Sequence, residues 1–225
     1  MTAAPIASDI DAVIFDMDGI LIDSERLYLQ AWRIVADEQN CPEIVPLFAD
    51  IVGLPYDELE KVLQRELKPP VTIEMLRQAI GDALQPILAN GYPLKPGTVE
   101  ILTYLQDRGL PCAVATSSTT SVAVKLNDNH IDHFFRHVVS RDQVARGKPR
   151  PDIYLEAAKR LGAAPARCLA VEDSKPGLLS ALAAGMNVVH IPDIAIIETD
   201  LMAQCMAVLP DLPALRDWLA QDAKQ

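Results

Sequence analysis

The fold follows from one stretch near the start of the chain, Ala12-Val13-Ile14-Phe15-Asp16-Met17-Asp18-Gly19. Its four apolar residues predict a buried strand, and its glycine permits a sharp turn where that strand ends. Ligands of open α/β sheets bind at the carboxyl ends of the strands. An Asp-x-Asp pair at such an end can hold a divalent cation and leave one carboxylate to attack or to move a proton. An acidic turn that only closes the strand is the alternative, because Asp and Gly are common in turns.

The composition argues against several kinds of protein. The chain has 225 residues and is 50% hydrophobic but only 5% aromatic, which is typical of an aliphatic globular core rather than of a disordered chain. Its net charge of −11 argues against sequence-independent binding to nucleic acid and against binding to an anionic membrane surface, so we expect neither as a partner. An acidic protein that binds phosphate needs a metal ion or well-placed Lys and Arg residues to reverse the local charge.

The cysteines and the hydropathy pattern bear on where the protein works. Cys41, Cys112, Cys168 and Cys205 are far apart and form no C-x-x-C pair, so neither a zinc knuckle nor a redox motif is visible. Residues 1–11 lack the basic and apolar segments of a secretory leader, and no apolar run is long enough to cross a bilayer. We therefore expect a protein of the reducing cytoplasm.

Short aliphatic runs alternate with helical patterns along most of the chain. The expected strands are residues 12–16, 112–116, 138–139, 168–171, 187–191 and 207–209. The expected helices between them are residues 99–108, 122–127, 151–161 and 177–184. Such alternation predicts an α/β fold with a mostly parallel sheet that is covered by helices on both faces.

The interval between the first and second strands breaks this alternation. From about Ser24 to Asn90 only helical patterning is visible, which is too long for one crossover helix. Asp23-Ser24 predict a helix N-cap at the entry, and residues 93–97 predict a return linker. We therefore expect a core domain of residues 1–23 and 91–225 and an inserted helical lobe of residues 24–90. Such a lobe can close over the edge of the sheet, although it can also only bury more surface or form a dimer face.

More polar residues stand at strand ends or in loops in the same relation to the sheet as Asp16. They are Thr116-Ser117-Ser118, Lys148-Pro149 and Glu172-Asp173-Ser174. Each taken alone has an ordinary explanation as a helix cap or a solvated loop. Because the carboxyl ends of parallel strands meet at one edge, together they predict a single site with acids, hydroxyl groups and an amine.

This set of groups suits phosphoryl transfer. A carboxylate that attacks a phosphate dianion meets electrostatic repulsion, which a magnesium ion held by Asp16, Asp18 and Asp173 would offset. Thr116 and nearby backbone N–H groups would bind the phosphoryl oxygens, and Lys148 would neutralise the charge carried through the transition state.

The motifs resemble those of a known family. Asp16 to Gly19, Thr116 to Ser118, Lys148-Pro149 and Glu172 to Ser174, in this order, resemble the four motifs of the haloacid dehalogenase-like (HAD) hydrolase superfamily. The helical insert and the longer runs 148–152 and 171–177 resemble its β-phosphoglucomutase-like branch. The resemblance implies a Rossmann-like core with a small helical cap domain.

The resemblance also implies roles for individual residues. Asp16 would attack phosphorus to give an aspartyl phosphate, and Asp18 would protonate the leaving oxygen and then deprotonate the attacking water. In the family the metal binds the Asp16 side chain, the Asp18 backbone carbonyl and Asp173 directly or through water, and Glu172 is counted with the metal site. The presence of Asp18 with Asp173 argues for phosphate rather than halide chemistry.

The remaining choice is between a phosphatase and a phosphomutase. β-Phosphoglucomutases carry cations or a histidine where this chain has Val52, Tyr56, Tyr28 and Thr119. These departures favour a magnesium-dependent phosphatase of small phosphorylated metabolites, such as sugar or sugar-acid phosphates. A β-phosphoglucomutase-type mutase is the alternative, and a non-catalytic binding protein with this fold is a third hypothesis.

Residues that contact the substrate are expected on both sides of the site. Gly53 and Tyr56 belong to an apolar and aromatic loop of the lobe, and Ser117 and Ser118 belong to the core. The loop suggests a less charged or smaller leaving group, although a cation elsewhere in the lobe, such as Arg77, could compensate. We expect a monomer or a weak homo-oligomer.

Overall fold

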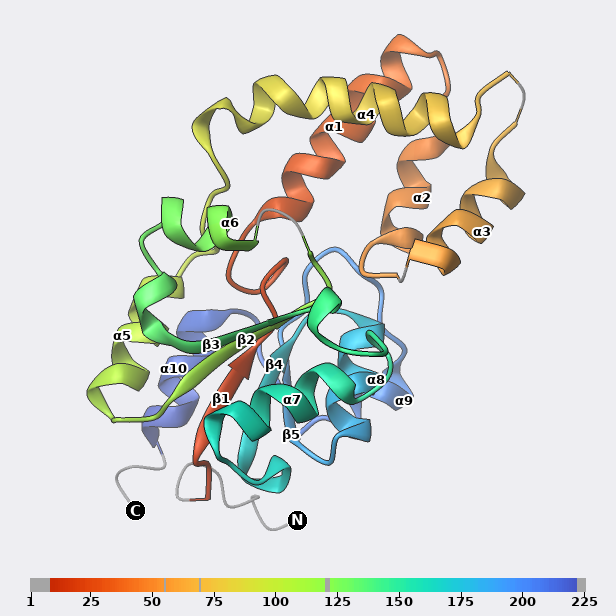
Figure 1. Ribbon diagram of the computed structural model, residues 1–225. Helices are drawn as coiled ribbons and strands as arrows, with labels where there is room; N and C mark the ends of the chain where they lie inside the picture. Colours follow the sequence, from red (N-terminus) through yellow and green to blue (C-terminus); the bar gives the residue numbers. More distant parts are fainter. Residues whose placement is uncertain (1–8, 55, 69, 120–121, 222–225) are drawn as a thin grey trace.

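A six-stranded sheet forms the centre of the protein (Figure 1). The computed structural model describes residues 9–54, 56–68, 70–119 and 122–221. The strands are β1 (Ala12–Phe15), β2 (Cys112–Thr116), β3 (Phe135–Ser140), β4 (Cys168–Glu172), β5 (Asn187–His190) and β6 (Ala207–Val208). Their order in the sheet is β3-β2-β1-β4-β5-β6, and every neighbouring pair is parallel. The predicted α/β fold is therefore confirmed, with β1 between β2 and β4.

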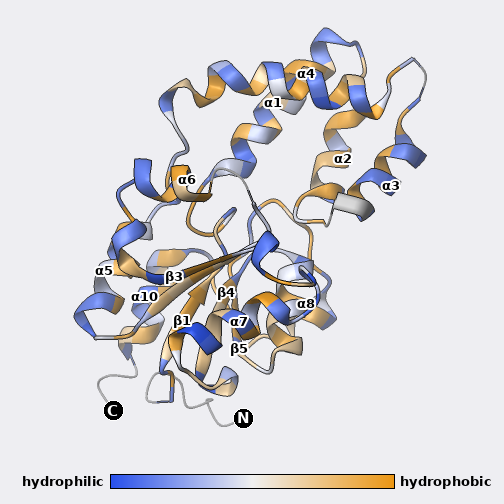
Figure 2. Ribbon diagram, viewed as in Figure 1, coloured by the Kyte–Doolittle hydropathy of each residue, from blue (hydrophilic) through white to orange (hydrophobic). Residues whose placement is uncertain are grey.

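Helices cover both faces of the sheet. They are α5 (Thr98–Asp107), α6 (Val122–Asp128), α7 (Asp152–Leu161), α8 (Lys175–Ala183), α9 (Thr199–Met202) and α10 (Leu212–Gln221). Alternate residues of β1 point to opposite faces: Val13 and Phe15 share a hydrophobic cluster with α5 and α10, and Ala12 and Ile14 share another with α7 and α8. Figure 2 shows hydrophobic residues along the central strands and mixed hydropathy on the helices, as a sheet buried on both faces requires.

The long interval after β1 is helical, as its patterning predicts. Its helices are α1 (Ser24–Glu38), α2 (Ile44–Ile51), α3 (Tyr56–Glu66) and α4 (Ile73–Ile87). They share a hydrophobic cluster that includes Trp32, Phe48, Leu63 and Leu76. Figure 1 shows these helices grouped beyond the carboxyl ends of the strands, where the sheet presents its loops.

The two segments that join these helices to the rest of the chain lie side by side. The Asp23 N–H donates to the Pro93 carbonyl at 2.8 Å, and the Lys95 N–H donates to the Leu21 carbonyl at 2.9 Å. Asp23 precedes α1, but its side chain does not cap the helix; it accepts a 2.6 Å hydrogen bond from Arg26 instead. The expected N-cap at Asp23-Ser24 is therefore wrong in its bonding, because a nearby guanidinium competes for the carboxylate.

Several element boundaries differ from the prediction. β3 starts at Phe135 rather than at Val138, because an edge strand tolerates the polar residues Arg136 and His137 that break the apolar run. α8 starts at Lys175 rather than at Gly177, since Ser174 caps it by accepting a hydrogen bond from the Gly177 N–H.

In the part of the chain that the structure describes, no helix is long and apolar enough to cross a membrane.

Candidate active site

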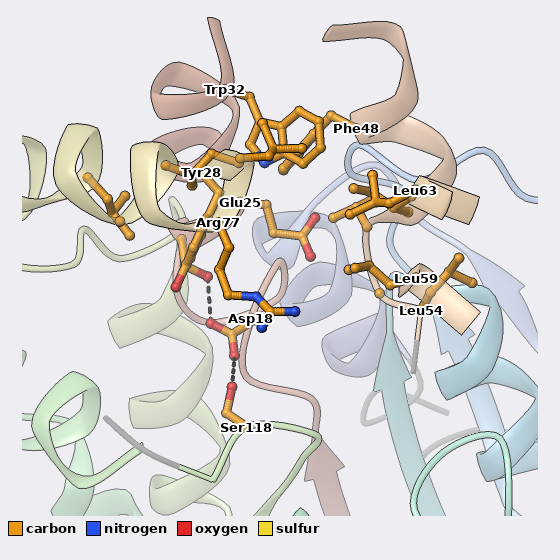
Figure 3. A pocket seen from close by; sticks show the side chains of 18 of the residues that line it. Asp18, Glu25, Tyr28, Trp32, Phe48, Leu54, Leu59, Leu63, Arg77 and Ser118 are labelled. Carbon is orange, nitrogen blue, oxygen red and sulfur yellow. Dashed lines mark hydrogen bonds between the residues drawn. The ribbon is translucent and has the colours of Figure 1, made fainter. Parts of the chain in front are cut away.

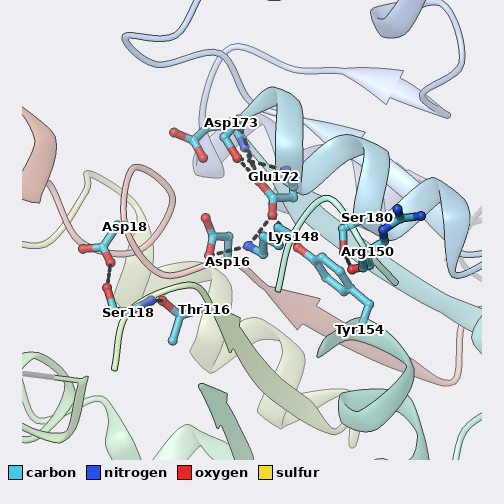
Figure 4. Close-up of polar contacts among 12 residues, drawn as sticks. Asp16, Asp18, Thr116, Ser118, Lys148, Arg150, Tyr154, Glu172, Asp173 and Ser180 are labelled. Carbon is cyan, nitrogen blue, oxygen red and sulfur yellow. Dashed lines mark hydrogen bonds and ion pairs between the residues drawn. The ribbon is translucent and has the colours of Figure 1, made fainter. Parts of the chain in front are cut away.

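Three buried charged residues contact one another in a row at the carboxyl edge of the sheet. Asp16 follows β1, Lys148 precedes α7, and Glu172 ends β4. The Lys148 Nζ lies 2.8 Å from Asp16 Oδ1 and 2.6 Å from Glu172 Oε1, as Figure 4 shows. The sheet brings Asp16 and Glu172 together because β1 and β4 are adjacent and parallel, and the loop before α7 places Lys148 in contact with both.

The pKa values of Asp16 and Lys148 follow from the burial of these groups and from the charges beside them. Burial raises the pKa of the Asp16 carboxyl to about 7, the Lys148 charge opposes that rise, and the Glu172 charge adds to it. Burial also acts to lower the pKa of Lys148, but Asp16 and Glu172 outweigh it and raise the pKa above its ordinary value. Lys148 therefore stays charged at neutral pH beside a carboxylate that can exchange its proton.

Both oxygens of Glu172 are already engaged by other groups. Oε1 accepts hydrogen bonds from Lys148 Nζ and, at 2.7 Å, from the Tyr154 hydroxyl. Oε2 accepts from the backbone N–H groups of Asp173 and Ser174 at 3.2 and 3.3 Å and from the Ser174 hydroxyl at 3.2 Å. This geometry makes Glu172 an anchor for Lys148.

Asp173 has a buried oxygen that suits a cation. Asp16, Glu172 and Asp173 each place one carboxylate oxygen within 4.8 Å of the others. Asp173 also belongs to a second cluster of this kind, with Glu25 and Asp193. Among the described residues, Asp173 Oδ1, Glu25 Oε2 and Asp193 Oδ2 are buried and lack a hydrogen-bond partner. Burial and then the neighbouring carboxylates raise the pKa of Asp173 well above its usual range and that of Glu25 to about 8. A cation with oxygen ligands would satisfy these groups.

Gly19 gives the Asp173 carboxylate its space. Its φ of 82° is left-handed, and a Cβ at this position would lie 2.1 Å from Asp173 Oδ2. A side chain at residue 19 would therefore displace the carboxylate that suits the cation.

Asp18 points to a different set of partners from those of Asp16. Its carboxylate accepts hydrogen bonds from the Ser24 hydroxyl at 2.5 Å and the Ser118 hydroxyl at 2.7 Å, and it forms an ion pair with Lys125. Figure 4 shows Asp18 turned toward Ser118 while Asp16 faces Lys148. The two aspartates of the opening motif thus occupy separate environments.

A cavity of about 220 Å³ collects most of the predicted site residues. It is lined by Asp16, Asp18, Glu25, Gly53, Leu54, Thr116, Ser117, Ser118, Lys148, Asp173 and Ser174. Thr116 is buried at the end of β2, where its hydroxyl accepts a 3.1 Å hydrogen bond from the Ser118 N–H, and Ser117 is exposed. Of the predicted residues, Glu172 lies behind Lys148 rather than on the cavity wall.

The lobe reaches this cavity through Gly53. A Cβ at Gly53 would lie 2.8 Å from the Cβ of Ser174, so the lobe loop closely approaches the loop after β4. Tyr56 begins α3, but its side chain lies outside the described part of the structure. Val52 and Tyr28 line a larger neighbouring cavity of about 520 Å³, which lies between the lobe and the sheet (Figure 3).

Sequence reasoning does not find Lys125 or Tyr154. Lys125 lies three residues after Val122 and just before Leu126, so helical spacing places it on the buried face of α6. A lysine on a buried helical face is a signal for a paired charge. Tyr154 follows Ile153 in the apolar pattern of α7 and looks like a core residue, although its hydroxyl contacts Glu172.

The geometry supports attack on an electrophile that carries negative charge. Asp16 faces the cavity as a candidate nucleophile. Lys148 places a positive charge beside it, and the carboxylates around Asp173 could bind a cation there. Hydroxyl groups and the backbone at Thr116 to Ser118 form the opposite wall. A phosphoryl group fits such a wall because its oxygens accept hydrogen bonds.

Comparison with known proteins gives relatives that cover 80% or more of the chain. A protein of Thermotoga maritima named phosphorylated carbohydrates phosphatase is 33% identical over 181 residues, covering 80% of this chain and 84% of that one. The probable pseudouridine-5'-phosphatase of Drosophila melanogaster is 33% identical over 221 residues, covering 91% and 95%. The crystal structure of a putative beta-phosphoglucomutase from Thermotoga maritima matches with a TM-score of 0.74 at 28% identity, covering 94% of this chain and 99% of that one.

The family match covers the same part of the chain as the site. Residues 10–185 match the haloacid dehalogenase-like hydrolase family. That range contains Asp16, Lys148 and Asp173, together with the sheet edge that brings them together. This chain therefore belongs to the haloacid dehalogenase-like hydrolase family.

Proposed function

We propose that the protein is a magnesium-dependent phosphatase that hydrolyses small phosphorylated metabolites, sugar phosphates among them. The strongest support is the meeting of Asp16, Lys148 and Asp173 at one cavity of about 220 Å³. This arrangement combines a nucleophile, a fixed positive charge and a buried carboxylate oxygen that lacks a partner among the described residues. Relatives that are named as phosphatases support the same reaction class.

We assign the metal to the Asp16 carboxylate, the Asp18 backbone carbonyl and Asp173. The oxygen donors and the unsatisfied Asp173 Oδ1 support a hard cation, and Mg²⁺ is the choice that the family resemblance implies. When bound, the ion supplies positive charge that offsets repulsion between a carboxylate and a phosphate. Glu172 belongs to this acidic group, but its contacts support a role in holding Lys148.

In the proposed reaction Asp16 forms a bond to phosphorus and the bond from phosphorus to the ester oxygen breaks. Asp18 gives a proton to the leaving alcohol, then takes one from a water molecule that attacks the aspartyl phosphate. This second step releases inorganic phosphate and restores the Asp16 carboxylate. Lys148 stabilises the charge on the transferring group, and Thr116, with Ser117 and Ser118, holds its oxygens.

We also propose that residues 24–90 form a cap domain and that residues 1–23 and 91–225 form the core domain. Helices α1–α4 supply all the buried members of one hydrophobic cluster except Cys41, and in it the rings of Trp32 and Phe48 meet edge to face with their centroids 5.7 Å apart. The described chain passes between the two parts at the paired segments around Asp23 and Pro93. Two such paired segments suit a lobe that moves over the site.

We place the working protein in the cytoplasm, as a monomer or a weak homo-oligomer without nucleic acid or membrane partners. The net charge of −11 supports the absence of polyanionic partners. The free thiols of Cys41, Cys112, Cys168 and Cys205 support a reducing compartment.

A phosphomutase remains the second candidate because Arg77 and Lys125 line the larger cavity. A mutase needs cations for a second phosphate. Lys125 is paired with Asp18, however, and Val52 and Tyr28 replace charged or imidazole groups by apolar and phenolic ones. These features favour the phosphatase.

Phosphate release tests the proposal. The protein is incubated with p-nitrophenyl phosphate and a panel of phosphorylated metabolites, with and without Mg²⁺. We expect turnover that requires Mg²⁺ and is abolished in Asp16→Asn. Absence of turnover by folded protein contradicts the proposal, and conversion of β-glucose 1-phosphate to glucose 6-phosphate without phosphate release favours the mutase.

A further inference from the structure

The larger cavity, of about 520 Å³, has two ends of different chemistry (Figure 3). The end near the sheet edge carries the polar side chains Asp18, Ser24, Glu25, Arg77, Ser118 and Lys125. The end inside the lobe is walled by members of the lobe's hydrophobic cluster, which are Trp32, Phe48, Leu63, Leu76 and Ile80. Its volume lies within the range that is typical of small-molecule sites.

The polar end adjoins the proposed phosphate site. Both cavities are lined by Asp18, Glu25, Gly53, Leu54 and Ser118. Figure 3 shows Arg77 reaching from α4 toward the side of the cavity where Asp18 lies. The shared lining gives a molecule whose phosphate lies beside Asp16 a route for its alcohol half past these residues into the lobe.

The lobe end offers hydrocarbon surface to that alcohol half. Trp32, Phe48 and Leu63 are buried members of the lobe's hydrophobic cluster, and Ile80 is a partly buried member of it. A hydroxyl group placed among these side chains loses its hydrogen bonds to water and gains none from them. A methylene group placed there has no hydrogen bonds to lose, and its transfer out of water is favourable.

We infer that the enzyme takes a further class of substrate, phosphomonoesters whose alcohol is a hydrocarbon chain that fills the lobe end of this cavity. The inference rests on the proposed phosphatase function and adds a specificity to it. The reaction is the same hydrolysis: the bond from phosphorus to the ester oxygen breaks, the alcohol leaves with a proton, and water supplies the new oxygen of inorganic phosphate. The lobe residues bind the chain and take no part in bond breaking.

A homologous series of alkyl phosphates tests the inference. Ethyl, butyl, hexyl and octyl phosphate are compared at concentrations below micelle formation, with glycerol phosphate and p-nitrophenyl phosphate as references for turnover. Burial of a methylene is worth about 0.8 kcal/mol, so kcat/KM is expected to rise by about fourfold per added CH₂ until the cavity is filled. Equal kcat/KM along the series, in enzyme that turns over the references, overturns the inference and leaves the phosphatase function intact.

Two substitutions on the same helix provide a matched pair. Ile80 lines the cavity, whereas Met75 is 49% exposed and lies outside the lining. Ile80→Asn is expected to flatten the dependence on chain length, and Met75→Asn is expected to leave it unchanged. Loss of the dependence in both variants, or in neither, contradicts the assignment of the chain to this cavity.

A binding measurement separates failure of the inference from failure of the proposed function. Trp32 lines the cavity, and Trp218→Phe removes the other tryptophan of the chain. Titration of this variant with 1-octanol is expected to give a saturable change in Trp32 fluorescence that Ile80→Asn weakens. Absence of saturation overturns the inference whatever the enzyme hydrolyses. Saturation without turnover of any phosphate ester supports the cavity's preference and contradicts the phosphatase function.

Discussion

Glu172 Oε1 accepts a 2.6 Å hydrogen bond from Lys148 Nζ in a part of the protein from which water is almost excluded. Two opposite charges that are both buried depend on each other, because either one alone would keep its desolvation penalty without compensation. The pair leaves Lys148 in contact with Asp16, which faces the cavity. Glu172 thereby sets the position of a cation at the site without lining the cavity itself.

Replacing Glu172 is predicted to reduce both stability and activity. Glu172→Ala leaves Lys148 short of a buried partner, and the expected loss in the free energy of unfolding is about 3–5 kcal/mol. Glu172→Gln keeps the size of the side chain and removes its charge, so we expect a smaller loss of stability and a fall in kcat on the order of tenfold, or ~1.4 kcal/mol. Urea unfolding and steady-state kinetics with p-nitrophenyl phosphate measure the two effects.

Glu156→Ala is the control for this pair of variants. Glu156 lies on α7 and pairs with Arg160 and Lys159 at the surface, where screening by water leaves an ion pair with little effect on stability. We expect little change in unfolding or in kcat. A loss of activity in this control as large as that in Glu172→Gln would mean that the effect does not come from the Lys148 contact.

The positions of Asp16, Thr116 and Asp173 were predictable because each lies at the carboxyl end of a strand of a parallel sheet. Such a sheet sends all its carboxyl ends to one edge, so order along the chain is enough to bring these residues together. Lys125 was not predictable in the same way, since its contact with Asp18 spans 107 positions and depends on how α6 docks. Local patterning marks Lys125 as buried but does not name its partner.

The lobe shows a second limit of what can be predicted from the sequence. Helical spacing of Leu59, Val62 and Leu63 indicates an apolar face, and the structure confirms that these residues belong to one cluster. Periodicity cannot tell whether facing side chains meet or leave space between them. The cavity of about 520 Å³ therefore emerges only from the way the helices cross.

The stability of the metal-free protein is predicted to fall as pH rises from about 4 to about 8. The pKa of Asp16 is raised to about 7 and that of Glu25 to about 8, in both cases mainly by burial. The folded state therefore binds more protons than the unfolded state over this interval, and its advantage is lost as pH rises through the folded-state pKa values. Thermal unfolding in EDTA at pH 5, 6, 7 and 8 measures the trend.

Mg²⁺ is predicted to stabilise the protein more at pH 8 than at pH 5, because it replaces protons on the same carboxylates. Glu25→Gln is the matched variant, and we expect it to flatten the metal-free profile. His190, whose pKa burial lowers, acts in the opposite direction near pH 6 and is unchanged in that variant. A metal-free stability that rises steadily from pH 5 to pH 8 would contradict the prediction.

Lys125→Met is predicted to lower kcat by about tenfold, or ~1.4 kcal/mol. The ion pair of Lys125 helps to hold the Asp18 carboxylate beside Ser118, and methionine fills similar space without the charge. Lys159→Met, at an exposed site on α7, is the control and is expected to leave kcat unchanged. Steady-state kinetics of the two variants with one substrate compare them directly, and equal kcat values would exclude a role for Lys125 in positioning Asp18.

Gly19→Ala is predicted to weaken Mg²⁺ binding as well as the fold, and Gly109→Ala separates the two effects. Both glycines have a left-handed φ, 82° at Gly19 and 68° at Gly109, so alanine at either position carries a strain of about 1–2 kcal/mol. A Cβ at Gly109 meets no atom within 4 Å, whereas one at Gly19 would lie 2.1 Å from Asp173 Oδ2. Gly19→Ala must therefore also move the carboxylate that we assign to the metal. Calorimetric titration with Mg²⁺ is expected to show at least tenfold weaker binding in Gly19→Ala and unchanged binding in Gly109→Ala, and equal affinities would place the metal away from Asp173.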